Sequence, residues 1–414
     1  MKWLGITHPK KNGVARVRGV LRSLGLAAMM LAATCLPGFA ADGAIATATS
    51  LSGGNSRTVL TVTLNHDVEP QLFTLANPYR VVIDLPNVVF RAGEPPQGGK
   101  GLVSAYRYGL MGRDRSRVVL DVKKPVKVEM HTQEAGEGRV LILDLVPTSR
   151  EAFLQAATRQ RAAAAPEPPP AVAVDNSDTR PLIVLDPGHG GVDSGARSRG
   201  GEQEKDAVLQ VALDLRKALL ATGHYRVLMT REDDTFVALG DRVKFARDHN
   251  AALFMSIHAD SLARPDDDVR GATIYTLSDR ASDREAAALA EKENRADLIA
   301  GVDLTEEPDD VAGILIDLTR RETRVFSARF ARDIVSDVRG VIKLNRNPVR
   351  SAGFRVLKAP DVPSVLMELG YMSNSQDLKL MLSEAWREKA VSALVKAIDS
   401  FFGARVARVP AASQ

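Results

Sequence analysis

Two histidines and two glutamates stand where they could hold a metal ion in this 414-residue chain. His189 follows the apolar run IVLDP, in a loop with four glycines, and His258 ends the run LFMSIH. Glu368 ends the run SVLME, and Glu204 lies at the start of the amphipathic helix predicted after the glycine-rich loop. If the three runs are neighbouring strands, all four side chains converge where the strands end.

Such a cluster has a definite chemistry. Two imidazoles and one carboxylate give three nitrogen or oxygen ligands and leave a fourth position for water, which is the arrangement of a catalytic zinc. Bound zinc lowers the pKa of that water towards neutrality, and a second carboxylate can carry its proton to a leaving amine. The spacing does not decide which glutamate is the ligand.

Each residue also has a structural alternative. Taken alone, His189 is more often an ordinary loop residue, and His258 is equally well explained as a core histidine. Glu368 resists such an explanation, because a carboxylate at the end of an apolar strand has to be paired or coordinated. The chain has no H-E-x-x-H pattern. We expect the other histidines outside the leader on the surface: His66, His131, His224 and His249.

Residues 1–40 have the features of a secretory signal with cleavage after Ala40: a basic start, a short apolar run and small residues near the end. The run is too short to favour a membrane anchor. The segment holds six cations and no acid, so the remaining chain has 49 basic and 51 acidic residues, a net charge of −2. This balance gives no support to nucleic-acid binding. Because the remaining chain lacks cysteine, any metal site must use histidines and carboxylates.

The pattern of residues changes along the chain after the expected signal segment. Residues 42–148 read as strands of a small all-β sandwich, and three runs share an Arg–aliphatic–Asp form that suggests a repeat of adjacent strands: Arg80–Leu85, Arg117–Val122 and Arg139–Leu145. Alternating Arg and Asp predict cross-strand pairs on a solvated face, with a ligand-binding face as the alternative. An Ala/Pro-rich linker over 149–180 follows, its start helical.

Residues 181–404 alternate between predicted strands and helices. This pattern predicts an α/β catalytic domain, an open mixed sheet flanked by helices, after the β sandwich. We expect its last helix over Ser383–Gly403 and a disordered tail over 405–414.

Several motifs add a family resemblance. LDPGHGGVDSGA, the EK at Glu204, TRED, SIHAD and VLMELGYMSN occur in the order seen in zinc-dependent N-acetylmuramoyl-L-alanine amidases, and residues 182–402 strongly resemble that family. The resemblance implies His189, Glu204 and His258 as zinc ligands and Glu368 as the catalytic carboxylate. It further implies hydrolysis of the amide between the lactyl group of N-acetylmuramic acid and L-alanine, during septal wall splitting. The β region resembles the AMIN domain, which is associated with envelope targeting and peptidoglycan binding.

Between the strands ATIYTLS and SVLMELG lie roughly eighty residues, more than a crossover needs, which predicts a helical insertion over about 279–325. In regulated members of the family, which this pattern resembles, such a helix covers the site and places a glutamate on the zinc. Glu293 is the candidate and Glu291 the runner-up; a solvated helix is the alternative. The run VAGILIDL over 311–318 is either a surface for an activator or core packing.

The resemblance implies peptidoglycan and a septal LytM-type activator protein as partners. We expect a periplasmic protein, no nucleic acid, and a monomer. Two other functions remain open at this stage. The ligand set alone also suits a zinc peptidase or deacetylase that cuts another peptidoglycan bond. A non-catalytic wall-binding protein would need only the β domain.

Overall fold

The computed structural model describes residues 43–95, 98–112, 114–136, 138–161, 178–261, 269–302 and 314–406. The expected signal segment, most of the linker, residues 311–313 of the VAGILIDL run and the chain from 407 on lie outside the described residues. The described residues belong to one compact unit. Among them, no helix has the length and apolar character needed to cross a membrane.

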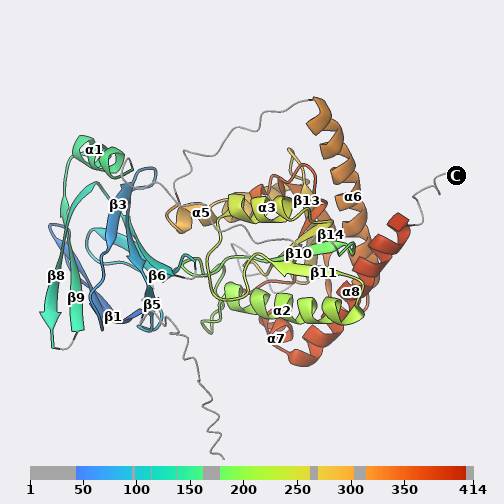
Figure 1. The fold of residues 1–414 in the computed structure, drawn as a ribbon, viewed down its shortest axis with the longest axis horizontal. Helices are drawn as coiled ribbons and strands as arrows, with labels where there is room; N and C mark the ends of the chain where they lie inside the picture. Colours follow the sequence, from blue (N-terminus) through green and yellow to red (C-terminus); the bar gives the residue numbers. More distant parts are fainter. Residues whose placement is uncertain are drawn as a thin grey trace, which may run out of the picture. The chain divides into compact units, whose positions relative to one another are not determined.

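Two antiparallel-rich sheets form the β domain (Figure 1). The first has the order β5-β1-β2-β9-β8, and the second has the order β3-β4-β7-β6. Alternating burial along TVLTVTL in β2 turns Leu60, Val62 and Leu64 into the core between the sheets. The strands are β1 (Ala44–Gly53), β2 (Thr58–Leu64), β3 (Gln71–Leu75), β4 (Arg80–Pro86), β5 (Val88–Phe90), β6 (Val103–Leu110), β7 (Arg115–Val122), β8 (Val126–Ala135) and β9 (Gly138–Pro147). Helix α1 (Arg150–Arg161) closes the domain, with Phe153 buried in the core.

The repeated Arg–Asp strands differ from the prediction in two ways. Strands β4 and β7 are neighbours, but β9 belongs to the other sheet. The cross-strand pairs exist, with Arg80 opposite Asp121 and Asp84 opposite Arg117. The prediction of a solvated face is wrong, because Arg80, Asp84 and Arg117 are buried. Residues 298–301, about 200 residues away in sequence, cover this face of the sheet. The alternation of residues along a strand cannot reveal such a distant contact.

A six-stranded mixed sheet with the order β11-β10-β12-β15-β13-β14 forms the centre of the α/β domain, as predicted. All of its pairs are parallel except β13 with β15. The strands are β10 (Leu182–Pro187), β11 (Arg226–Met229), β12 (Leu253–His258), β13 (Ala272–Leu277), β14 (Leu344–Ala352) and β15 (Ser364–Glu368). Strand β14 was not predicted, because LNRNPVRSA has no apolar alternation.

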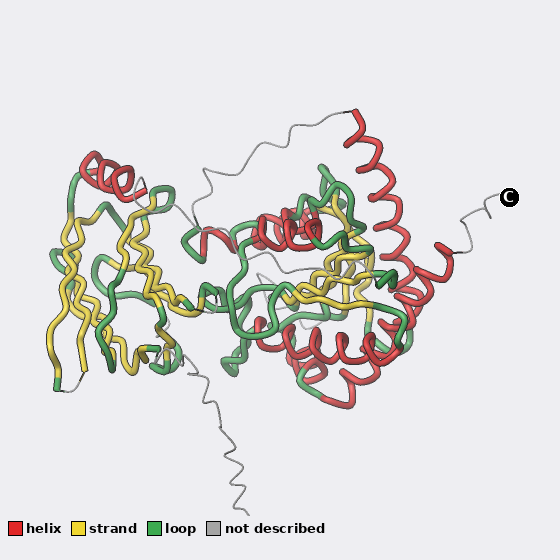
Figure 2. Tube along the Cα trace, viewed as in Figure 1, coloured by secondary structure: helices red, strands yellow, loops and turns green. Residues whose placement is uncertain are grey.

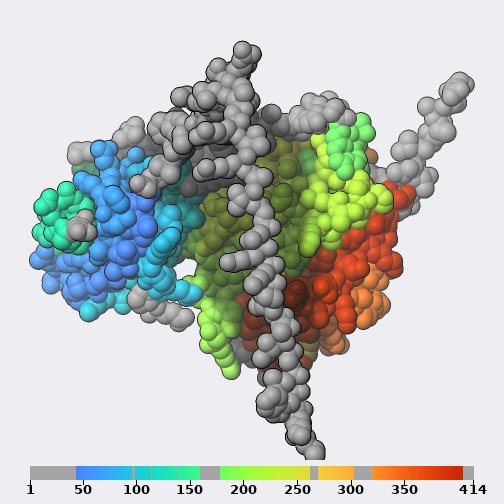
Figure 3. Space-filling view, turned by 60° about the horizontal axis from the view of Figure 1, so that its bottom comes forward, coloured from blue at the N-terminus to red at the C-terminus, as the bar shows by residue number. Residues whose placement is uncertain are grey.

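Helices cover both faces of this sheet (Figure 2). Ile183 and Met255 point into a core with α2, α6 and α8, whereas Val184 and Phe254 point into a second core with α3 and α4. Helices α6 and α8 pack side by side (Figure 3). The helices are α2 (Glu204–Thr222), α3 (Leu239–Asp248), α4 (Arg284–Glu293), α5 (Ala296–Ile299), α6 (Ile314–Val338), the short η2 (Arg355–Leu357), α7 (Ser375–Met381) and α8 (Glu384–Val406). Helix α8 continues past Gly403, where its end was predicted.

Candidate metal centre

The predicted convergence of the strands is confirmed. Strand β10 lies beside β12, and β12 lies beside β15, all parallel, so their carboxyl ends meet at one edge. His258 and Glu368 are register partners on β12 and β15. His189 follows β10 directly, and Glu204 is the first residue of α2. All four side chains are buried.

The glycine-rich loop allows the two imidazoles to approach each other. A Cβ at Gly188 would lie 2.4 Å from ring atoms of His258, and one at Gly195 would lie 2.6 Å from His189. His189 itself has φ of 59°, a left-handed conformation that is uncommon outside glycine. The imidazole rings therefore meet edge to face, with their centroids 4.9 Å apart.

The donor atoms are spaced as a metal site requires. Glu204 Oε1 lies 3.1 Å from His189 Nε2 and 3.2 Å from His258 Nδ1. Ligand atoms 2.0–2.1 Å from a tetrahedral metal ion lie about 3.3–3.4 Å from one another. Neither imidazole nitrogen has a hydrogen-bond partner among the described residues. Three buried donors around one point, two of them unsatisfied, fit a bound cation, so these residues could hold a metal ion.

Backbone amides fix the orientation of the Glu204 carboxylate. Ala259 N donates to its Oε1 and Ala196 N to its Oε2, both at 2.8 Å. Burial alone would raise the pKa of Glu204, but the two adjacent histidines lower it well below its usual value. The group is therefore held as a carboxylate, the form that binds a metal.

Asp193 is part of the cluster, and the sequence analysis missed it. Its Oδ2 lies 2.8 Å from His189 Nδ1, and its Oδ1 accepts a hydrogen bond from Gly195 N. A carboxylate on the far nitrogen of a ligating histidine fixes the ring and its tautomer. The signal was present as an acid four residues after the histidine. Burial opposes the charge on Asp193, but His189 lowers its pKa below the usual value.

The imidazole of His189 is set in a strongly negative environment. Burial alone would lower the pKa of His189, but the neighbouring carboxylates, chiefly that of Glu204, raise it well above its usual value. Such an excess of negative charge around an imidazole attracts a divalent cation.

Glu368 has a different environment. Its Oε2 accepts a hydrogen bond from Asp260 N at 2.8 Å, and its Oε1 has no hydrogen-bond partner among the described residues. Burial, and then the charges of Glu204 and Glu293, raise the pKa of Glu368 well above its usual value. A carboxyl group with a raised pKa is a better proton acceptor than an ordinary carboxylate, as a general base requires.

A third glutamate completes the cluster. Glu293, the last residue of α4, places its Oε2 3.5 Å from His189 Nε2 and 3.3 Å from His258 Nδ1. It is 5% exposed. Glu291, the runner-up, has a largely exposed side chain paired with Arg295 and does not reach the cluster. Lys292 forms an ion pair with Asp260, which holds the end of the helix over the strands.

Beneath the glycine-rich loop lies a buried polar network that sequence reasoning also missed. Asp186 accepts hydrogen bonds from Ser256 and Arg242 at 2.6 and 2.7 Å. Arg231 donates to the carbonyls of Pro187 and Gly188, and burial lowers the pKa of Arg231 to about 10. The network fixes the loop that carries His189. Of the four histidines expected on the surface, His249 is instead buried.

Comparison with known proteins agrees with this centre. The family described as N-acetylmuramoyl-L-alanine amidase matches residues 183–400, and the AMIN domain matches residues 50–145. The amidase AmiC of Neisseria meningitidis serogroup B is 31% identical over 380 residues, which are 87% of this chain and 90% of that protein. AmiC of Escherichia coli O6:H1 is 32% identical over 382 residues, 86% of this chain and 89% of that protein.

A solved structure, the amidase AmiC2 of Nostoc punctiforme, aligns with 54% of this chain and 97% of its own, with 25% identity and a TM-score of 0.38. The matches to family and relatives support an enzyme and not a non-catalytic wall-binding protein. Both domains and nearly the whole length of the relatives are represented, so this chain belongs to the N-acetylmuramoyl-L-alanine amidases that cut peptidoglycan and carries an AMIN domain before its catalytic domain.

Proposed function

We propose that this amidase is a zinc enzyme in which His189, Glu204 and His258 bind the metal. The observation that carries the proposal is the spacing of the donor atoms, 3.1 and 3.2 Å from the Glu204 oxygen to the two imidazole nitrogens. A donor set of imidazole and carboxylate in tetrahedral spacing is typical of zinc. Asp193 positions the ring of His189.

The proposed reaction cuts the amide between the lactyl group of N-acetylmuramic acid and L-alanine. When bound, zinc would polarise the scissile carbonyl and make a water molecule acidic. Glu368 takes a proton from the attacking water and delivers it to the departing amine of L-alanine. Its raised pKa supports the first of these steps, because a more basic carboxylate takes up a proton more readily.

The enzyme is autoinhibited in this proposal. Glu293 would fill the fourth ligand position and exclude both water and substrate, which is supported by its 3.3 and 3.5 Å distances to the two imidazoles. Helix α4 is anchored at its other end by Arg350, which donates to Glu285 and Asp283. A partner protein, by resemblance a LytM-type activator at the septum, would draw the helix away.

Export and a role in daughter-cell separation complete the proposal. The features of residues 1–40 support a cleaved signal and a periplasmic location. A peptidoglycan substrate lies in that compartment.

The test uses purified sacculi and mass spectrometry of the released products. We compare the chain from residue 41, a variant lacking Ala281–Leu304, and that shortened variant with Glu368→Ala. Stem peptides beginning with L-alanine from the shortened variant alone would support both the bond and the inhibition. Equal release with and without the segment would contradict autoinhibition. Release of other fragments, with zinc bound, would point to a zinc hydrolase of another bond.

A further inference from the structure

The segment that follows the inhibitory helix docks on the β domain. Four successive backbone carbonyls, at residues 298–301 (the 298–301 turn), accept hydrogen bonds from three arginines of the second sheet. Arg80 binds Leu298 O, Arg107 Nε binds Ile299 O at 2.6 Å, and Arg117 Nη1 binds the carbonyls of Ala300 and Gly301 at 3.2 and 3.1 Å. We call Arg80, Arg107 and Arg117 the arginine face.

Carboxylates of the same sheet hold two members of the arginine face in place. Arg117 forms a two-point pair with Asp84 at 2.6 and 2.9 Å, and Arg107 does so with Asp121 at 2.7 and 3.1 Å. A planar guanidinium held in this way loses little freedom when its remaining N–H groups bind a carbonyl. The Arg117–Asp84 pair, which joins two of the Arg–Asp runs of the sequence, and the Arg107–Asp121 pair therefore orient donors toward the turn.

Close packing accompanies the hydrogen bonds. Gly301 has φ of +69°, and a Cβ there would lie 3.0 Å from a methyl of Val82 and 3.3 Å from one of Val119. Both valines are fully buried on the outward side of the sheet. Ala300 is also fully buried and packs with Val192 and Phe236 of the catalytic domain. The turn is thus held between the two domains.

Few residues separate this contact from the inhibitory carboxylate. The turn begins five residues after Glu293, and backbone hydrogen bonds shorten the intervening chain, with Asn294 N bound to Ala290 O and Ile299 N to Arg295 O. Asp297 accepts a hydrogen bond from Leu239 N at 2.9 Å. A displacement of Glu293 from the histidines would therefore pull on the turn and strain its bonds to the arginine face.

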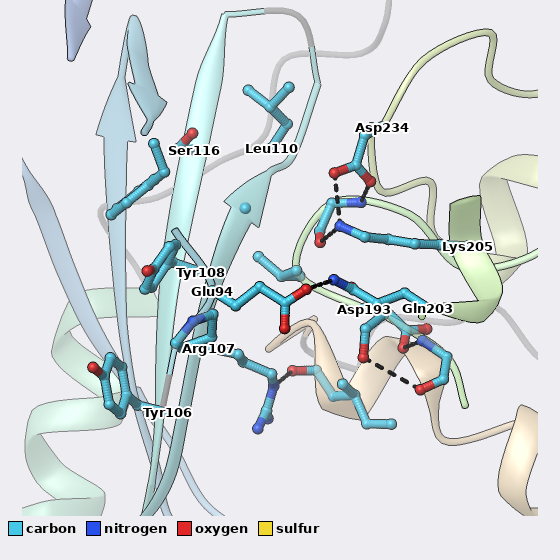
Figure 4. A pocket seen from close by; sticks show the side chains of 18 of the residues that line it. Glu94, Tyr106, Arg107, Tyr108, Leu110, Ser116, Asp193, Gln203, Lys205 and Asp234 are labelled. Carbon is cyan, nitrogen blue, oxygen red and sulfur yellow. Dashed lines mark hydrogen bonds and ion pairs between the residues drawn. The ribbon is translucent and has the colours of Figure 1, made fainter. Parts of the chain in front are cut away.

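The rest of the interface combines direct contact with open space. Phe236 N of the catalytic domain donates to Leu110 O of the β domain at 3.1 Å. A cavity of about 600 Å³ lies beside Arg107, between the β domain and the glycine-rich loop (Figure 4). Polar contacts cross or line it, such as the bonds from Glu94 to Arg197 and Gln203 and the pair of Lys205 with Asp234. An interface with an open cavity and several polar contacts is suited to reversible separation. The turn is the part of this interface that lies nearest in sequence to Glu293, so it is the part that can restrain the inhibitory helix.

We propose that the AMIN-type β domain keeps Glu293 over the metal site. The hydrogen bonds between the arginine face and the 298–301 turn provide this restraint, which we call the docking contact. This proposal rests on the autoinhibition described above. The docking contact and the position of Glu293 are coupled reciprocally. A partner that binds the arginine face therefore opens the metal site, and a partner that withdraws α4 uncovers the arginine face.

The test weakens the contact from each side in the full exported chain. Arg107→Gln acts on the β domain, where Arg107 is the least buried of the three, and Gly301→Asn adds a side chain against Val82 and Val119 while tolerating the left-handed backbone. Arg57→Gln removes an exposed pair with Asp144 on the other sheet and is the matched control. The readouts are stem-peptide release without activator and hydrogen–deuterium exchange of residues 284–301.

We expect Arg107→Gln to raise basal release about tenfold, the usual effect of one lost hydrogen bond to a charged donor. Gly301→Asn should also raise it, because the added side chain crowds Val82 and Val119. Both variants should speed exchange in 284–301. Arg57→Gln should change neither. In a Glu293→Gln background the two variants should add no further activity. If Arg107→Gln and Gly301→Asn keep the hydrogen–deuterium exchange and the stem-peptide release of the wild type while Glu293→Gln is active, the role of the docking contact is contradicted and the autoinhibition is not. Inactivity of Glu293→Gln would overturn the autoinhibition, and the exchange data would still report on the docking contact.

Discussion

The Oε2 atom of Glu293 lies 3.3 Å from the Nδ1 atom of His258. The two residues come from different elements, the end of an inserted helix and the end of a central strand. Two buried groups approach so closely only when they share a proton or a cation. Nδ1 of His258 has no hydrogen-bond partner among the described residues, which supports the proposed metal ion between the two groups.

The first prediction concerns the ion pair that holds the end of α4. Lys292→Ala removes the contact with Asp260 and should raise basal amidase activity up to about fivefold, because a half-exposed pair contributes at most ~1 kcal/mol. Release of stem peptides from sacculi without activator measures it. Lys244→Ala, which breaks an exposed pair with Asp248 on α3, is the control. Unchanged activity in both variants would mean that Lys292 does not restrain the helix.

A second prediction tests the positioning role of Asp193. Asp193→Asn should weaken zinc binding roughly 10–100-fold, because the ring of His189 loses the carboxylate that orients it. Competition with a chelator measures the affinity directly, without substrate. Asp248→Asn on the exposed side of α3 should have no effect. Equal zinc affinity in the two variants would contradict the role of Asp193.

Glu368 should matter for the rate and not for the metal. Glu368→Gln keeps the size of the side chain but cannot carry a proton. The double variant Glu293→Gln with Glu368→Gln should therefore be about 10²–10⁴ times less active than Glu293→Gln alone. Zinc content should stay at that of the parent. A large loss of zinc would instead make Glu368 a ligand, in place of or beside Glu204.

The glycine-rich loop gives a fourth prediction. Gly188→Ala places a methyl group 2.4 Å from the imidazole of His258 and should displace that ring, with loss of zinc binding. Gly240→Ala at the start of α3 meets open space and should stabilise the fold by about 0.4–1 kcal/mol. Zinc binding and the free energy of unfolding of each variant provide the comparison. Normal zinc affinity in Gly188→Ala would show that the ring can move without consequence.

The sequence predicted which residues meet at the ends of the strands better than it predicted which faces of the sheets are covered by other segments. His258 and Glu368 were placed correctly because carboxyl ends of parallel strands meet at one edge, a rule that needs no long-range information. Arg80 and Asp84 were expected in solvent, since alternation reveals which side faces the core but not what later covers the other side.

The choice between Glu291 and Glu293 shows the same limit. Both residues lie on α4, and their side chains project from different sides of the helix. The choice therefore depends on which face α4 turns to the strands. Asp193 was missed because a loop carboxylate has no periodicity, and only the geometry of the His189 ring assigns it a partner.

The most direct test of the proposed inhibition at the metal site compares Glu293→Gln with Glu291→Gln in the chain from residue 41. Both remove one charge from the same helix, but only Glu293 contacts the histidines. With zinc loaded and no activator, we predict that Glu293→Gln releases stem peptides beginning with L-alanine from sacculi at least tenfold faster than the wild type, while Glu291→Gln does not. Equal release by both variants and the wild type would contradict the assignment of Glu293 to the metal.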